Sequence, residues 1–249
     1  MSANAFFRWT ELDCSTYPAW RDGILEAEAS GSAMPGPPRS YPGYPRWTLE
    51  RVRPRLWPSL DRVLTRRRCM YPLGTALPPR RRVSRLLQTS HGITKETNRG
   101  PVPSAGGLQA LELYVLMLTP GWAPTGWYHY DRVGHHLSQL VSDVDRDVLR
   151  TMIPSLERIE GGALLWLIIG DGERVAAKYA ERGLRFLLLE AGHLMQNLCL
   201  VSASLGLATV PLGGFFEREL ARRLMLLDGD EVLYAGICGM PLAASRGTR

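Results

Sequence analysis

The stretch Gly162-Ala163-Leu164-Leu165-Trp166-Leu167-Ile168-Ile169 is a continuous apolar run of strand length with glycines at its ends. A short run without polar interruption is typical of a strand that is buried on both faces. We therefore expect it to be the central strand of a sheet, with the other elements arranged around it.

A second sheet signal lies upstream of this run. Gly126-Trp127-Tyr128-His129-Tyr130-Asp131 is a short aromatic segment, and aromatic side chains favour the half-buried surface of a sheet. Residues 135–140 are predicted to be its hairpin partner. The segment 108–118 is rich enough in Leu, Val and Tyr to be the start of a helix, a buried strand, or one after the other.

Helices are predicted around these strands. In residues 59–68, Leu60, Val63 and Leu64 have helical spacing and Ser59 can cap the helix. Further helices are expected near residues 82–88, 145–153, 174–183, 184–206 and 217–226, with the helices 174–183 and 184–206 joined or kinked at Gly183. A last strand is expected at residues 231–239. This mixture favours the α+β class, with a mostly antiparallel central sheet flanked by helices.

The chain has 249 residues, 45% hydrophobic and 22% charged, which suits one sizeable domain with an additional arm. We place the boundary so that residues 1–58 form a Pro/Gly-rich N-terminal arm and residues 59–249 the domain. The arm is expected to be extended, because the runs Met34–Pro38 and Tyr41–Pro45 repeat Pro and Gly too often for helix interiors. Its aromatic residues suggest that it packs on something; they include Trp20, Tyr41, Tyr44 and Trp47.

Several features favour a cytoplasmic location. The four cysteines lie far apart and form no CxxC pair, and the N-terminus lacks a basic stretch followed by an apolar run. The apolar stretch 184–206 carries Arg185, Glu190 and His193, which are costly in hydrocarbon. We expect free thiols and a core helix rather than a membrane span.

The positive charge is concentrated in one region. The net charge is +6, yet residues 46–99 contain thirteen Arg and one Lys against three acidic residues, so this region carries 14 − 3 = +11. Such asymmetry suggests that the region faces something anionic. A phosphate-bearing cofactor or an acidic peptide is a candidate, whereas no DNA- or RNA-binding pattern accompanies the charge.

The loop Pro103-Ser104-Ala105-Gly106-Gly107 places small residues where a planar ligand could approach the backbone. An ordinary turn would explain the loop equally well if it stood alone. Further motifs follow it in order: Leu111-Glu112-Leu113-Tyr114, the aromatic segment 126–131, Glu181-Arg182-Gly183, Glu190-Ala191-Gly192-His193, Gln196-Asn197, and Pro211-Leu212-Gly213-Gly214-Phe215. Together, over roughly residues 59 to 241, they resemble the SagB-type dehydrogenases of the FMN-dependent nitroreductase superfamily.

The resemblance implies a nitroreductase-like fold and an intertwined homodimer with FMN at the subunit interface. It also implies that a basic element, a Pro-Ser-Ala-Gly segment and a later Gly-Gly loop hold the FMN. In this sequence the implied residues are Arg66, Arg67, Arg68, Pro103, Ser104, Ala105, Gly106, Gly107, Gly213 and Gly214, with Asn197 in a cofactor or interface role. No metal ligand is implied.

The basic element departs from the family pattern, which is Arg-Arg-Ser-x-Arg. Arg68 stands where serine is usual, and Met70 stands where the last arginine is. One ligand of the FMN phosphate is therefore altered, although Arg80, Arg81, Arg82 or Arg85 could replace it.

The pair Lys178-Tyr179 matches a Lys-Tyr element of the azoline-oxidising branch of the family. The match implies a lysine base and a tyrosine that positions or relays the proton. A surface lysine and a packing tyrosine on an amphipathic helix remain the alternative.

The resemblance thus predicts an FMN-dependent dehydrogenase that oxidises azolines to azoles in a ribosomally made peptide, beside a cyclodehydratase partner. Two alternatives are open. One is a flavin oxidoreductase acting on a small or carrier-bound molecule. The other is a degenerate, non-catalytic scaffold, motivated by Arg68 and Met70.

Three other functions lack support in the sequence. Glu190 and His193 form an ExxH pair, but no second such motif is present to complete a di-iron site. A P-loop and a GxGxxG motif are also absent, so nucleotide hydrolysis and a Rossmann-type NAD site are not predicted.

Overall fold

The computed structural model describes residues 3–31, 38–52, 58–93, 99–142 and 144–242. A seven-stranded sheet forms its centre, in the order β1-β4-β3-β2-β5-β7-β6, and its neighbouring strands pair antiparallel. The strands are β1 (Arg46–Thr48), β2 (Leu111–Met117), β3 (Gly126–Asp131), β4 (His136–Val141), β5 (Leu164–Asp171), β6 (Ala208–Leu212) and β7 (Asp230–Gly239). The predicted α+β class and antiparallel sheet are confirmed, and residues 111–117 form a strand.

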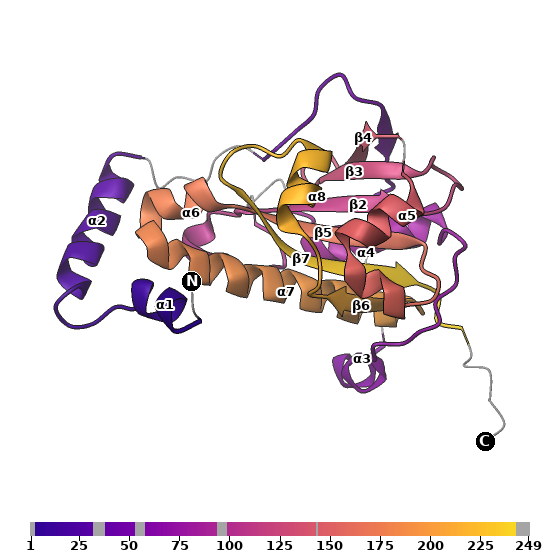
Figure 1. Cartoon of the computed structure of the whole chain (residues 1–249), viewed down its shortest axis with the longest axis horizontal. Helices are drawn as coiled ribbons and strands as arrows, with labels where there is room; N and C mark the ends of the chain where they lie inside the picture. The colour runs from indigo at the N-terminus through magenta and orange to yellow at the C-terminus, as the bar shows by residue number, and fades with distance from the viewer. Residues whose placement is uncertain (1–2, 32–37, 53–57, 94–98, 143, 243–249) are drawn as a thin grey trace.

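Helices cover both faces of the sheet. They are α1 (Ala3–Trp9), α2 (Tyr17–Ala29), α3 (Leu60–Arg66), α4 (Arg80–His91), α5 (Arg146–Met152), α6 (Gly172–Tyr179), α7 (Gly183–Ser204) and α8 (Glu217–Leu224). Figure 1 shows α7 running alongside the sheet and α1 and α2 projecting beyond α6.

Strand β5 divides the core into two layers, because successive side chains of a strand point to opposite faces. Leu164, Trp166 and Ile168 pack with residues of α4 and α7. Their neighbours Leu165, Leu167 and Ile169 pack with residues of α5 and α8. The strand pairs with β2 on one side and β7 on the other, which confirms the predicted central strand.

The break between α6 and α7 lies three residues before Gly183. The chain turns at Ala180 (φ +47°, ψ −143°), and a short 3-10 turn leads into α7. Gly183 instead begins α7, where a Cβ atom would lie 2.9 Å from the Val175 carbonyl oxygen. The stretch Gly172–Ser204 is long and apolar enough to cross a membrane by length and composition, but half of its most apolar window is buried inside the protein, as in a core helix.

The prediction that the N-terminal arm is extended is wrong for its first part, which forms α1 and α2. Pro18 lies in the first turn of α2, where a proline sacrifices no helical hydrogen bond. Most of the run Met34–Pro38 lies outside the described residues. Strand β1 pairs with β4, so the arm also supplies an edge strand.

The predicted packing of the arm's aromatic residues is confirmed. Trp20 stacks on Tyr179, and the rings of Tyr41 and Tyr44 contact each other edge to face. Tyr41 also contacts His129, and Trp47 contacts Tyr128. The arm is thus attached to the domain at two places, α6 and the sheet.

Candidate functional site

The loop Pro103–Gly107 forms one wall of a cavity of about 430 Å³, which Arg99 also lines. Gly106 (φ +58°) and Gly107 (φ +70°) adopt a left-handed conformation that favours glycine. Both glycines are exposed, so their backbone is accessible to a ligand. The Ser104 hydroxyl accepts a hydrogen bond from the backbone N–H of Gln109 at 2.8 Å, which closes the loop.

Lys178 and Tyr179 reach this loop from the end of α6. A Cβ atom on Gly106 would lie 2.5 Å from Tyr179 Oη and 3.0 Å from Lys178 Nζ. Only glycine permits this approach. The structure therefore brings the two predicted catalytic residues against the predicted cofactor loop, although more than 70 residues separate them in sequence.

Glu190 lies beneath the same loop, on α7. Its side chain is buried, and Ser104 and the backbone of Ala105 hydrogen-bond to it. Burial raises the pKa of Glu190 to about 7, against the lowering effects of these hydrogen bonds and of the Arg132 and Arg174 charges. The sequence places Glu190 in an ExxH pair that belongs to the motifs of the family resemblance and is expected to supply core hydrogen-bonding groups, but its partner His193 is exposed.

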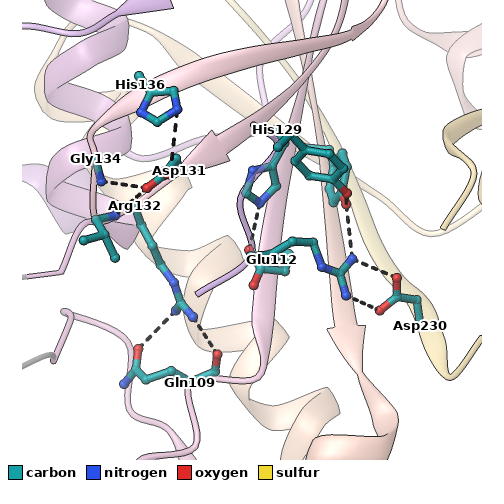
Figure 2. A network of polar contacts seen from close by, with 12 residues as sticks. Gln109, Glu112, His129, Asp131, Arg132, Gly134, His136 and Asp230 are labelled. Carbon is teal, nitrogen blue, oxygen red and sulfur yellow. Dashed lines mark hydrogen bonds and ion pairs between the residues drawn. The ribbon is translucent and has the colours of Figure 1, made fainter. Parts of the chain in front are cut away.

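Arg132 fixes the far end of the loop, as Figure 2 shows. It is 3% exposed and donates to the Gln109 carbonyl oxygen at 2.7 Å and to Gln109 Oε1 at 3.2 Å. Arg174 donates to the same carbonyl oxygen at 3.3 Å. No sequence motif marks Arg132, because an arginine that follows a strand does not show which backbone groups its side chain will bind.

A buried pair of hydrogen-bonded side chains lies beside Arg132, on β2 and β3. Glu112 Oε2 and His129 Nε2 are 2.9 Å apart, and both side chains are buried. Burial would raise the pKa of Glu112, but the hydrogen bond and electrostatic interaction with His129 and the charges of Arg132 and Arg39 lower it to about 2. Glu112 is therefore a structural anion at neutral pH.

Asn197 connects the loop segment to α4. Its side-chain amide donates to the carbonyl oxygens of Ser90 and Pro101, both at 3.4 Å. This contact holds the start of the loop against α7. It gives Asn197 a positioning role beside the predicted cofactor loop.

The second glycine loop, Gly213–Gly214, follows β6 and lies elsewhere. The backbone N–H of Gly214 donates to Ser155 Oγ at 2.9 Å. Together with Tyr71 and Arg158, the two glycines line a cavity of about 470 Å³. Both glycines are exposed.

The predicted basic element lies at the end of α3. Arg66 and Arg68 are exposed and Arg67 is partly exposed. The hydrogen bonds described for these side chains are local: Arg67 donates to Cys69 Sγ, and Arg68 donates to the Arg67 carbonyl oxygen. Their guanidinium groups remain accessible to an anion from solvent.

The two glycine loops that are predicted to hold the cofactor lie on opposite faces of the sheet. Val102 and Leu108, which flank the first loop, pack in the layer of α4 and α7. Leu212 and Phe215, which flank the second loop, pack in the layer of α5 and α8. Bare glycine backbone beside a cavity fits a planar ring, and accessible arginines fit a phosphate, but one chain presents its two glycine loops on different faces of the sheet.

The family model and the relatives named below are similar to this chain over most or about half of its length. The model of the nitroreductase family matches residues 64–240. MJ1384 of Methanocaldococcus jannaschii, provisionally assigned as a nitroreductase, is 29% identical over 168 residues, which are 68% of this chain and 85% of that protein. The microcin B17-processing protein McbC of Escherichia coli is 30% identical over 135 residues. That match spans 51% of this chain and about half, 49%, of McbC.

Two solved structures share the fold. A protein of Ralstonia eutropha JMP134, also provisionally assigned as a nitroreductase, has a TM-score of 0.71 at 22% identity, over 83% of this chain and 94% of that chain. A chain of the E. coli microcin synthetase McbBCD complex with truncated pro-MccB17 bound has a TM-score of 0.60 at 20% identity. That match covers 94% of this chain and 99% of the other.

Proposed function

The chain belongs to the nitroreductase family, and from this premise we propose that it is an FMN-dependent oxidoreductase that oxidises azoline rings of a ribosomally made peptide to azoles. The observation that carries the proposal is the contact of Lys178 and Tyr179 with Gly106. A base and a proton-positioning hydroxyl thereby face the loop that would carry the flavin ring.

The chemistry requires two hydrogens to leave the azoline ring, one as a proton and one as a hydride equivalent. Bound FMN would accept the hydride equivalent. Lys178, as the neutral amine, takes the ring proton, and the hydroxyl of Tyr179 orients the ring or relays that proton. Ser104, Glu190 and Arg132 keep the loop in place for this step.

Two comparisons support a peptide substrate. McbC is named as a microcin B17-processing protein, and the McbBCD structure contains a truncated pro-MccB17. The SagB-type resemblance of the motifs adds a cyclodehydratase as the partner that would supply the azoline.

A homodimer would complete the cofactor site. Because the sheet separates the two glycine loops within one chain, a two-fold related copy is needed to bring Gly213–Gly214 of one subunit to Pro103–Gly107 of the other. Leu188 and Leu189 on α7 are 48% and 61% exposed. We propose that this face of α7 lies in the dimer interface.

The first test is the visible absorbance of the purified protein after incubation with FMN. The flavin band should remain after gel filtration, and protein that takes up no FMN would contradict the proposal.

Lys178→Ala should retain the flavin spectrum and lose conversion of an azoline peptide to the azole. Full activity of this variant would remove Lys178 as the base.

A flavin oxidoreductase for small molecules is the second candidate. The match to MJ1384 favours it, because that match covers 85% of a protein provisionally assigned as a nitroreductase. Rapid reduction of nitroaromatics with NAD(P)H, together with no action on azoline peptides, would establish this second candidate.

The third candidate, a scaffold without FMN, rests on the departures at Arg68 and Met70 from the family pattern. Stoichiometric FMN in the purified protein would exclude this candidate.

A further inference from the structure

A cavity at the start of α4 combines positive charge with apolar surface. Its volume is about 310 Å³, and it is lined by three arginines and three apolar residues: Arg81, Arg82, Arg85, Val52, Pro79 and Leu205. Arg81 and Arg82 are exposed, and Arg85 is half-buried. These arginines belong to the positively charged region 46–99, to which the proposed function gives no role beyond the cofactor.

The charges of Arg81 and Arg82 are not neutralised by the fold. In the parts of the chain that the structure describes, no carboxylate forms an ion pair with either side chain. The first turn of α4 also lacks acidic residues, although the positive end of the helix dipole makes acids stabilising and arginines unfavourable there. Helix stability therefore does not explain why arginines stand at this end of α4.

The neighbouring Arg80 is different, because it has a partner within the protein. Its guanidinium lies 5.9 Å from the centroid of the Trp122 ring, close enough for a cation–π contact. Packing accounts for this arginine. A ligand is needed only for Arg81 and Arg82.

The lining of the cavity indicates what kind of ligand fits. Arginine binds carboxylates with two parallel hydrogen bonds, and Val52 and Leu205 offer apolar surface beside these donors. A polypeptide segment with both acidic and apolar side chains matches the two features. Single-stranded nucleic acid would be held by stacking on aromatic rings, and none of the described residues that line this cavity is aromatic.

The cavity lies about one helix length from the proposed flavin loop. Helix α4 has 12 residues, so it is about 18 Å long. At its other end the Asn197 amide donates to the carbonyl oxygens of both Ser90 and Pro101, which places the start of the loop there. An extended peptide advances about 3.3 Å per residue and needs at least about five residues to join the two places.

We propose that Arg81 and Arg82, with the cavity beside them, bind an acidic segment of the peptide substrate, separated in the peptide by at least about five residues from the azoline that is oxidised. The inference rests on the proposed function, which makes a peptide the substrate. The site holds the peptide and takes no part in the oxidation. Because both arginines are exposed, salt should weaken the binding.

Fluorescence anisotropy tests this site in the full-length protein. The probe is the rhodamine-labelled peptide Gly-Glu-Leu-Glu-Gly-Glu-Leu-Glu-Gly, and a control probe has Gln in place of each Glu. Arg81→Gln/Arg82→Gln should weaken binding of the Glu probe about fivefold, as expected for the loss of two exposed ion pairs. The matched control, Arg218→Gln/Arg222→Gln, removes two exposed arginines of α8 and should bind like the wild type. Equal Kd values in the three proteins, or equal binding of both probes, would overturn the proposal.

Two competitors identify the class of ligand. Excess FMN should leave the Glu probe bound, whereas its displacement would assign Arg81 and Arg82 to the cofactor phosphate. A labelled single-stranded DNA should bind more weakly than the Glu probe. Tighter binding of the DNA that is lost in Arg81→Gln/Arg82→Gln would assign the surface to nucleic acid, and either of these results overturns the proposal.

Thermal unfolding distinguishes a binding role from a structural one. Arg81→Gln/Arg82→Gln should unfold at the same Tm as the wild type or at a higher one, because the change removes positive charge from the first turn of α4. A clearly lower Tm would show that the two arginines support the fold, which contradicts their assignment to a ligand.

Azole formation separates this inference from the proposed function. In the wild type, kcat/KM should be higher for an azoline peptide with an acidic segment than for its Gln counterpart, and Arg81→Gln/Arg82→Gln should bring the ratio of the two values close to one. An unchanged ratio in an active variant overturns only the inference. If the wild type forms no azole but binds the Glu probe through Arg81 and Arg82, the proposed function fails and the site for an acidic peptide stands.

Discussion

Arg39 and Asp230 form a bidentate ion pair, with N–O distances of 2.7 and 2.8 Å, that joins the segment after α2 to the first residue of β7. Their side chains are only 13% and 3% exposed. Arg39 also donates to Tyr114 Oη, which shares a hydrogen bond with the Tyr41 hydroxyl. The arm is therefore held at the sheet by a buried ion pair, in addition to its contacts at α6.

Arg39→Met should lower the free energy of unfolding by about 3 kcal/mol, because it leaves the buried Asp230 carboxylate without its partner. Urea unfolding followed by circular dichroism gives the value. The control is Arg150→Met, which breaks an ion pair to Asp147 whose side chains are 58% and 87% exposed and should cost less than about 0.5 kcal/mol. Similar losses in both variants would show that the Arg39 pair contributes no more than a surface contact.

Glu190 should make stability fall as the pH rises. Its pKa in the folded protein is about 7, against an ordinary value of 4.5, with burial as the main cause. Between these two pH values the unfolded chain has released a proton that the folded chain keeps, so the free energy of unfolding decreases with rising pH in this window and no further above it.

Glu190→Gln removes this dependence. The variant's free energy of unfolding should therefore rise relative to the wild type by up to about 3 kcal/mol from pH 4.5 to pH 7.5. Urea unfolding at several pH values measures the difference. A constant difference across this range would mean that the carboxyl group, which Arg132 and Arg174 face, titrates at its ordinary pKa.

Gly106→Ala and Gly107→Ala should have similar effects on stability but different effects on activity. Both place a side chain at positive φ, which costs about 1 kcal/mol or more. Only a Cβ atom on Gly106 meets Tyr179 and Lys178, whereas one on Gly107 meets nothing within 4 Å.

Because Tyr179 Oη and Lys178 Nζ are the ends of flexible side chains, both groups can move aside in Gly106→Ala. Displacement of the catalytic pair should then lower azole formation at saturating FMN at least about tenfold relative to Gly107→Ala. Thermal unfolding checks the shared cost, and the azole assay checks the difference. Equal activity would indicate that the pair does not act over Gly106.

Leu189→Asp should convert the dimer into a monomer that retains no FMN. Leu189 is 61% exposed on the face of α7 that we place in the interface, and a charge there would be desolvated on association. Light scattering after gel filtration gives the mass, and absorbance gives the bound flavin. Leu227→Asp, at a residue 66% exposed in the loop after α8, is the control and should remain a dimer with FMN. A wild-type monomer that holds FMN would contradict the dimer proposal.

Local sequence determined the central strand, the β3–β4 hairpin, the last strand and most of the helices, whereas it left residues 108–118 open and gave no sign of β1 or β6. The apolar run at 162–169 became the central strand β5, and the aromatic segment at 126–131 became β3 with β4 as its hairpin partner. Ser59 caps α3 as its position predicted, accepting a hydrogen bond from the backbone N–H of Arg62. Burial pattern and capping act over a few residues, so they can be predicted without knowledge of the fold.

The arm shows where this kind of prediction fails. The overall Pro and Gly content of residues 1–58 suggested an extended segment. Helix α2 nevertheless forms, because it ends before the first run rich in Pro and Gly begins at Met34. Its contacts are with distant residues: Trp20 lies on Tyr179, and Glu28 pairs with Lys178, 150 residues away. Such contacts leave no periodic pattern in the local sequence.

By itself, the sequence determined the antiparallel α+β fold, the glycine loop at 103–107 and the Lys178-Tyr179 pair as candidates. Only the tertiary structure decided which of these meet. It packs α6 so that the pair reaches Gly106, buries Glu190 beneath the loop, and leaves Gly213–Gly214 on the other side of the sheet. The physical reason is that residue type sets what a side chain can do, whereas the packing of helices on the two faces of the sheet sets which side chains lie close enough to act together.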